Sequence, residues 1–109
     1  MTLMAWLIYI LQVTIISIQF KDMVVVRIKN NSKNELPEYA NPGDSGFDLR
    51  ANVARVTTIL PGHRAIIPTG LHVDIPEGYE IQIRSRSGLA AKHGIFVLNS
   101  PGTIDAKKL

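Results

Sequence analysis

The chain has 109 residues, no cysteine and a formal charge of +3 at pH 7. This length accommodates one domain, and the lack of cysteine excludes a disulfide scaffold, a thiolate zinc site and a cysteine nucleophile. A hydrophobic fraction of 46% with 19% charged residues argues against intrinsic disorder, and the small positive excess suits a small anionic ligand better than a long polyanion.

The chain opens with a hydrophobic segment, residues 1–20, in which fifteen residues are apolar and none is charged. Twenty residues suffice to span a bilayer as a helix, and the basic residues that follow would keep the rest of the chain in the cytoplasm. Met23 directly precedes a well-patterned strand and is a candidate start. We therefore divide the chain into 1–22, an upstream extension or a membrane anchor, and 23–109, the domain. We favour the extension, and expect a cytoplasmic location with membrane contact only through 1–20.

From Met23 onward, apolar residues recur with a period of two, as in half-buried strands. The alternation is clearest over residues 24–29, 71–75 and 79–84, and further β-rich runs cover 56–60, 65–67 and 95–98. Pro-Gly pairs separate these runs, and the Pro-Glu-Gly of residues 76–78 predicts a hairpin. Many short strands divided by turn signals predict an all-β fold: a sandwich, a barrel or a jelly roll.

One short helix is predicted over residues 87–93, with Ser87 as its N-cap and Gly94 just past its end. Where the preceding strand meets this helix, exposed amides, the Arg86 guanidinium and the Ser87 hydroxyl suit an anion, and Gly88 permits close approach to the main chain. Spacing alone fits an ordinary capped helix with solvated arginines better. Ser87 is a poor nucleophile candidate, because no G-x-S-x-G elbow surrounds it.

A second candidate segment is DSGFDLRA, residues 44–51. Asp48 lies between Phe47 and Leu49 and therefore occupies the outward side of a short strand. A carboxylate there suits a hydrated magnesium ion or the orientation of a basic side chain, although a lone strand aspartate is more often structural.

The third candidate segment is LNSPGTID, residues 98–105, where Pro-Gly predicts a tight turn after an apolar strand. Asn99 offers a donor and an acceptor for the edge of a base. Asp105 is suited to act as general base on a water molecule. In isolation, a polar hairpin turn is the better explanation of the segment.

Taken together and in order, DSGFDLRA, RSRSGLAAKHG and LNSPGTID closely resemble the first three signature motifs of the trimeric deoxyuridine triphosphatases (dUTPases). The resemblance extends from Met23 to about Ala106. It implies a jelly-roll (β-clip) subunit that forms a homotrimer with three active sites at subunit interfaces. It also implies Mg²⁺-assisted hydrolysis of dUTP to dUMP and diphosphate, in dUMP biosynthesis and dUTP removal.

The resemblance also implies a role for each matching residue. Asp105 would activate the water that attacks the α-phosphorus, and Asp48 would help to place Mg²⁺ through water. The phosphates would be contacted by Arg86, Ser87 and Gly88.

The uracil and its sugar would be bound by the third motif. Asn99 would pair with the uracil edge, and the nucleoside pocket would be shaped by the backbone of Gly102, Thr103 and Ile104.

The chain departs from the family pattern after Asp105. It reads Ala-Lys-Lys-Leu, with Lys108 where the family has a tyrosine, and the family's fourth and fifth motifs are absent, together with several C-terminal strands. We therefore expect a domain incomplete at its C-terminus, explained more simply by a truncated gene model, a frameshift or a pseudogene fragment than by a dedicated short enzyme. We also expect weak or absent dUTPase activity for the chain as written.

Two alternatives stay open at this point. One is an inactive fragment that keeps nucleotide binding or subunit contacts, and the other is a dCTP deaminase-like member of the same superfamily. We expect no nucleic-acid partner, because basic and aromatic residues are not interleaved. The three histidines lack the spacing of metal ligands.

Overall fold

A computed structural model describes residues 9–15 and 24–106 of the chain. Predictions that concern 1–8, 16–23 or 107–109, including the Met23 start and the position of Lys108, lie outside these residues. Within the described part, no helix combines the length and the apolar character needed to cross a membrane.

The described chain forms six short strands and one helix, which confirms the all-β class. In chain order these are β1 (Tyr9–Ile15), β2 (Arg27–Asn30), β3 (Gly46–Arg50), β4 (Leu71–Asp74), β5 (Ile81–Ser85), α1 (Ser87–His93) and β6 (Gly102–Ile104). A four-stranded sheet has the order β3-β1-β5-β6, and β2 pairs with β4 in a second sheet. All of the pairings are antiparallel, and the described strands form no closed barrel.

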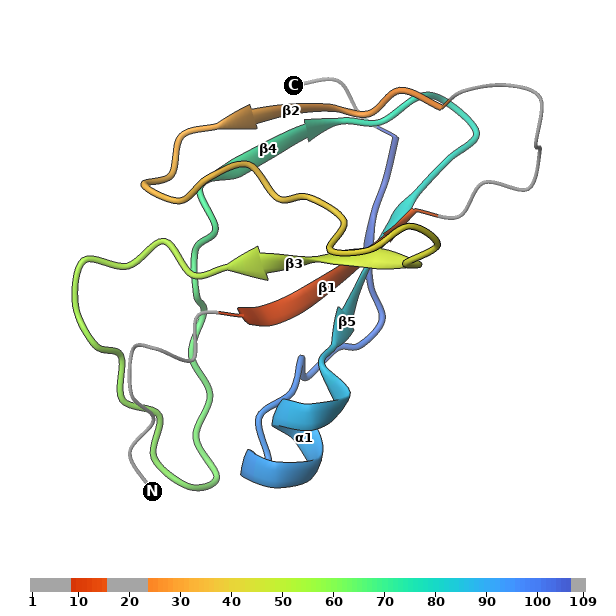
Figure 1. The fold of residues 1–109 in the computed structure, drawn as a ribbon. Helices are drawn as coiled ribbons and strands as arrows, with labels where there is room; N and C mark the ends of the chain where they lie inside the picture. The colour runs from red at the N-terminus through yellow and green to blue at the C-terminus, as the bar shows by residue number, and fades with distance from the viewer. Residues whose placement is uncertain (1–8, 16–23, 107–109) are drawn as a thin grey trace.

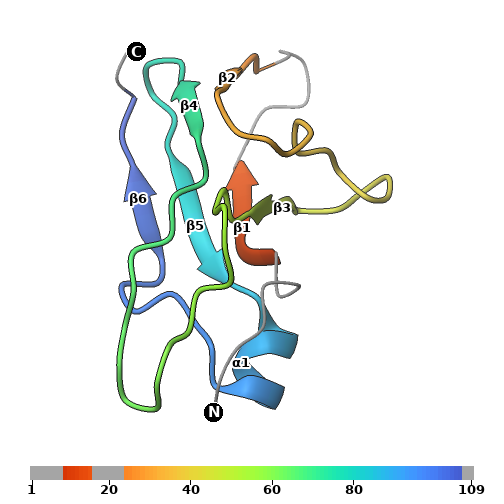
Figure 2. The same cartoon turned by 90° about the vertical axis from the view of Figure 1, so that its left-hand side faces the viewer.

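The four-stranded sheet lies between the other two parts of the fold (Figure 1). The β2–β4 pair covers one side of this sheet. The helix α1 follows β5 and lies at the end of the fold away from that pair. In Figure 2, β5 points toward α1, whereas β6 runs away from it. This antiparallel arrangement determines which candidate residues lie near the helix.

The core forms where the inward faces of the two sheets meet. Its buried residues are Phe47 and Leu49 from β3, Ile75 after β4, and Ile81 from β5. Half-buried side chains of the β2–β4 pair, among them Ile28 and Val73, pack against them. The predicted period-two alternation is clearest over residues 24–29, where half-buried and exposed residues alternate without exception.

The predicted helix over Ser87–His93 is confirmed, but its N-cap is not Ser87. Arg86 occupies the capping position with extended backbone, and no side chain caps the helix; Ser87 is already its first helical residue. At the other end, Gly94 adopts the left-handed conformation at φ 64°. Its N–H donates to the Ala90 carbonyl at 3.1 Å, the 5→1 bond of an αL motif, and the Ile95 N–H donates to the Leu89 carbonyl at 3.2 Å.

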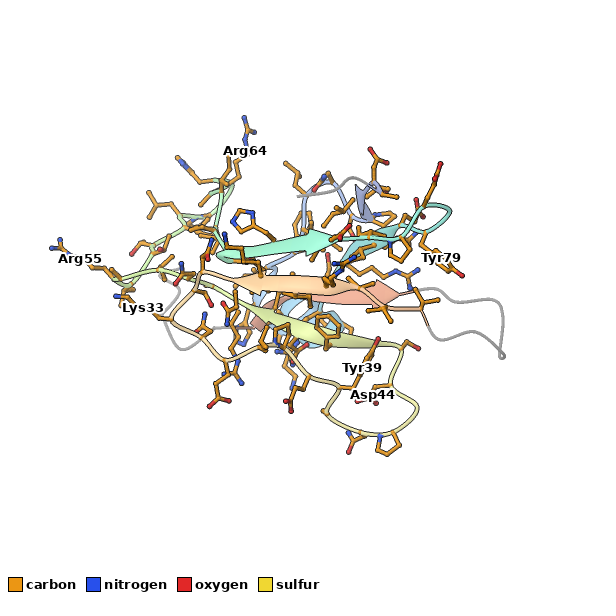
Figure 3. The ribbon with its side chains drawn as sticks, turned by 90° about the horizontal axis from the view of Figure 1, so that it is seen from above. Lys33, Tyr39, Asp44, Arg55, Arg64 and Tyr79 are labelled. Atoms are coloured by element: carbon orange, nitrogen blue, oxygen red, sulfur yellow. The ribbon has the colours of Figure 1, made fainter. Side chains whose placement is uncertain are left out.

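Three runs predicted as strands, 56–60, 65–67 and 95–98, are not strands. Residues 51–70 instead form one long loop between β3 and β4, and none of the three runs has a partner strand in the described part of the chain. Figure 3 shows Arg55 and Arg64 pointing outward from this loop. Apolar composition favoured strands here, but a strand needs a ladder partner as well.

Two predicted turns also differ. The turn at residues 76–78, in which the Tyr79 N–H donates to the Pro76 carbonyl at 3.2 Å, connects β4 to β5 in different sheets and is not a hairpin. In the third motif the turn precedes the Pro-Gly pair, because the Ser100 N–H donates to the Val97 carbonyl at 3.1 Å. Gly102 already belongs to β6.

Candidate active site

The centre of the candidate site is an ion pair between β3 and the residue that follows β5. Phe47 and Leu49 are buried, so Asp48 between them faces outward, as predicted. Its Oδ2 lies 3.5 Å from Nη1 of Arg86, and both side chains are a little over a third exposed. An ion pair this exposed contributes at most about 1 kcal/mol to stability. Its main effect is to hold the two side chains in a fixed relative orientation.

The turn that follows Arg86 is open to a ligand. Ser87 and Gly88 are exposed, and a Cβ added at Gly88 would meet no atom within 4 Å. The first turn of α1 contains no acidic residue, so nothing there repels an anion. The guanidinium, the hydroxyl and the open main chain therefore form a surface that suits phosphate oxygens.

The third motif folds back on itself around Gly102. This residue is buried and pairs with Ile83 of β5. A Cβ at Gly102 would lie 3.5 Å from Nδ2 of Asn99 and 3.5 Å from the Ile83 Cβ. The amide of Asn99 therefore lies over the backbone of Gly102, close to the main-chain groups of β6 that follow.

The structure does not bring Asp105 to the ion pair. Because β6 runs antiparallel to β5, Ile104 lies opposite Ile81, and Asp105 follows at the end of β5 that is distant from α1 (Figure 2). Arg86 lies five residues further along β5 than Ile81, roughly 17 Å at the usual rise of a strand. Within one chain, the predicted catalytic carboxylate and the predicted phosphate site are at opposite ends of the sheet.

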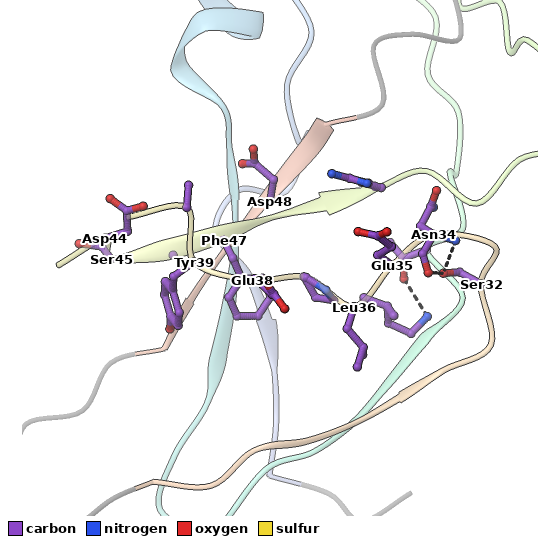
Figure 4. Close-up of a pocket in the computed structure, with 16 residues that line it drawn as sticks. Ser32, Asn34, Glu35, Leu36, Glu38, Tyr39, Asp44, Ser45, Phe47 and Asp48 are labelled. Carbon is purple, nitrogen blue, oxygen red and sulfur yellow. Dashed lines mark hydrogen bonds between the residues drawn. The ribbon is translucent and has the colours of Figure 1, made fainter. Parts of the chain in front are cut away.

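A cavity of about 710 Å³ lies beside β3, on the side of Tyr39 (Figure 4). Tyr39 packs edge-on against Phe47, with ring centroids 5.3 Å apart. The carboxylates of Glu35, Glu38 and Asp44 line this cavity and would repel a triphosphate. Asp48 and Arg50 also line this cavity, so it borders the strand that carries the ion pair.

Two polar residues have roles that the sequence motifs did not reveal. The Ser85 hydroxyl accepts a hydrogen bond from the Val97 N–H at 2.9 Å, which ties the end of β5 to the segment that leads to Asn99. Asp44 Oδ2 accepts from the Asn41 N–H at 2.7 Å and closes the turn before β3. In the sequence, the local indication of these roles is a polar side chain next to the end of a strand for Ser85, and next to a Pro-Gly pair for Asp44.

The side chains of the candidate site suit a metal ion only if the ion keeps water molecules as ligands. Among the described residues, no three His, Cys, Asp or Glu side chains are grouped as a metal cage would require. Mg²⁺ commonly keeps several waters and binds through one or two carboxylates plus substrate phosphates. Asp48, already paired with Arg86, fits contact through water.

Fold and site together define an all-β domain with an open turn that carries Arg86 between a strand and a short helix. The family model described as dUTPase matches residues 32–108. The chain belongs to the dUTPase family, and the predicted family is thereby confirmed.

Curated relatives from chlamydiae agree with this family. The Chlamydia pneumoniae protein named deoxyuridine 5'-triphosphate nucleotidohydrolase is 64% identical over 76 residues, which is 70% of this chain and 52% of that protein. Proteins of the same name from Chlamydia muridarum and Chlamydia felis are 64% and 62% identical over 72% and 66% of this chain, and 54% and 49% of their own lengths. The chain thus spans about half the length of the curated relatives it matches. The family is generally metal-dependent.

Proposed function

We propose that this domain hydrolyses dUTP to dUMP and diphosphate, within dUMP biosynthesis and dUTP removal. The observation that carries the proposal is the open turn at Arg86, Ser87 and Gly88, with Asp48 held 3.5 Å from the guanidinium. This turn lies inside the family-matched segment, and relatives at 62–64% identity are named for dUTP hydrolysis.

In this proposal the turn holds the triphosphate. The Arg86 guanidinium donates two hydrogen bonds to phosphate oxygens, Ser87 donates a third, and Gly88 lets the chain approach without a Cβ. Asp48 keeps Arg86 oriented and accepts hydrogen bonds from water bound to Mg²⁺. When bound, Mg²⁺ neutralises part of the triphosphate charge and favours one conformation of it.

The third motif recognises the nucleoside. The amide of Asn99 offers a donor and an acceptor to the edge of uracil. The backbone of Gly102, Thr103 and Ile104 lines the pocket beside it, and because Gly102 lacks a Cβ the amide of Asn99 can lie over its main chain.

Asp105 acts as the general base in the hydrolytic step. Its carboxylate takes a proton from a water molecule, whose oxygen attacks the α-phosphorus as the bond to the bridging oxygen breaks. The products are dUMP and diphosphate, so atoms and charge balance. Since Asp105 lies at the opposite end of β5 from Arg86, the carboxylate must come from a neighbouring copy, and we propose a homotrimer with a site at each interface.

Asp105→Asn tests this function. We expect the wild-type protein to release diphosphate from dUTP in the presence of Mg²⁺, and the variant to lose at least a hundredfold in kcat while its affinity for dUTP changes little. A wild-type protein that binds dUTP without releasing diphosphate would support the non-catalytic alternative instead. The same assay measures the weak activity expected from the sequence, which stays a prediction, as does the cytoplasmic location.

A further inference from the structure

The hydrophobic start of the chain contributes a strand to the centre of the sheet. The family match begins at residue 32, so β1 lies outside it. Yet in the sheet order β3-β1-β5-β6 this strand is the neighbour of both β3 and β5 (Figure 2). A strand from outside the family-matched segment therefore connects two strands that lie inside it.

β1 also lies between the two strands from which Asp48 and Arg86 come. β3 carries Asp48, β5 leads into Arg86, and these two strands pair with β1 but not with each other. In the register, Gln12 lies opposite Asp48 on one side and opposite Arg84 on the other. Two ladder spacings separate β3 from β5 by roughly 9.6 Å, and Arg86 reaches Asp48 across that width.

The sequence of β1 suits this position. It reads YILQVTI, rich in the β-branched and aromatic residues that favour strands. Its register against β3 shifts between Tyr9, opposite Arg50, and Leu11, opposite Leu49. One extra residue on β1 makes a bulge, which fixes the register of a strand against slipping.

We propose that β1 is a resident strand of the domain that positions Asp48 and Arg86 for phosphate binding. Without β1, β3 and β5 would each expose a row of unpaired backbone groups, or would close on one another and halve the spacing that Arg86 spans. The positioning role rests on the proposed function, whereas the place of β1 in the sheet does not.

A designed disulfide tests the placement without any assay of activity. The chain has no cysteine, so a pair introduced by substitution is its only thiol pair. Thr14 lies opposite Gln82, and residues directly opposed on antiparallel strands have Cα separations suited to a disulfide. We expect Thr14→Cys with Gln82→Cys to form an intrachain disulfide under mild oxidation, seen as a mass loss of two hydrogens.

The matched control pairs Thr14→Cys with Ile83→Cys, one residue out of register and on the opposite face of the sheet. We expect this pair to stay reduced. Equal oxidation of both pairs, absence of the disulfide in the in-register pair, or a disulfide between chains would each overturn the placement of β1.

Hydrogen exchange provides a second measurement on the full chain. Val13→Pro removes a donor from the centre of β1, and we expect the amides of β3 and β5 to lose at least tenfold in protection. Val25→Pro, at an exposed residue outside the strands, should leave them unchanged. Unaltered protection in Val13→Pro would contradict the proposal.

The oxidised double variant, Thr14→Cys with Gln82→Cys, also distinguishes the proposed function from the proposed role of β1. If β1 positions the site, locking it in place should leave dUTP turnover and KM within about twofold of the wild-type values, and Val13→Pro should raise KM at least tenfold. A correctly locked protein whose wild-type parent hydrolyses no dUTP would refute the proposed function and leave β1 as a resident strand. A locked protein that loses turnover while its parent keeps it would refute the positioning role.

Discussion

Gly70 shows how a single residue can hold two loops together. Its carbonyl accepts from the Asn31 N–H at 2.8 Å, and its backbone has φ +70°. A Cβ placed there would lie 2.9 Å from the Ser32 Cβ and 3.0 Å from Nδ2 of Asn52. Both the conformation and the space therefore require glycine.

Gly70→Ala should accordingly destabilise the fold more than the same change at Gly78. Gly78 has φ +88° but nothing within 4 Å of an added Cβ, so Gly78→Ala costs only backbone strain, about 1–2 kcal/mol. Gly70→Ala adds a steric clash, and we expect about 3 kcal/mol or more in total. Urea unfolding of both variants gives the comparison, and equal losses would show that the space around Gly70 relaxes freely.

Arg86 is the residue whose geometry the proposed site needs most. A lysine keeps the charge but loses the planar fork that matches two phosphate oxygens and holds Asp48. We expect Arg86→Lys to raise KM for dUTP about tenfold, equivalent to about 1.4 kcal/mol. Arg84→Lys is the control, because Arg84 is exposed and donates to Gln82 Oε1 within its own strand; steady-state kinetics that affect both variants alike would contradict the assignment.

At the scale of residues, sequence reasoning succeeded where a single strand or helix end determines the outcome. The outward face of Asp48 follows from alternation with Phe47 and Leu49, and the left-handed Gly94 follows from the need to end a helix. The role of Ser85 could not be predicted, because its partner, the Val97 amide, is twelve residues away and only the tertiary fold brings them together.

At the scale of elements, the hydrogen bond of Ser85 joins the end of β5 to the segment that carries Asn99. Ser85→Ala leaves the half-buried Val97 N–H without this partner, and we expect a loss of about 1 kcal/mol in stability. Ser45→Ala, at an exposed residue before β3, should change stability far less. Thermal unfolding compares the two, and a similar loss in both variants would mean that the Val97 amide finds water instead.

The existence of most elements could be predicted, but their pairing could not. Period-two patterns indicated β2, β4 and β5, and residues 56–60 carry an apolar composition of the same kind without forming a strand. What distinguishes them is a partner in the ladder, which depends on contacts distant in sequence. The place of β1 was missed for the same reason: an uncharged apolar run fits a helix or a central strand equally well.

At the scale of the whole molecule, one face carries apolar side chains with nothing packed over them in the described part of the chain. Ile66 is 98% exposed and Leu98 68%, and Phe96 lies with them along an apolar cavity of about 650 Å³. Contiguous apolar surface of this kind marks a contact with another protein surface. This surface supports the proposed homotrimer, as does the separation of Asp105 from Arg86 within one chain.

Mixing two inactive variants tests whether sites are shared between copies. Asp105→Asn keeps Arg86, and Arg86→Ala keeps Asp105, so neither variant alone forms a complete site. If each site takes these residues from different copies, random assembly of equal amounts should restore about a quarter of the sites. The variants are unfolded together, refolded and assayed for diphosphate release, with each variant refolded alone as the control. Activity that stays at the level of the separate variants would place both residues of a site in one chain, in conflict with the antiparallel β5–β6 register.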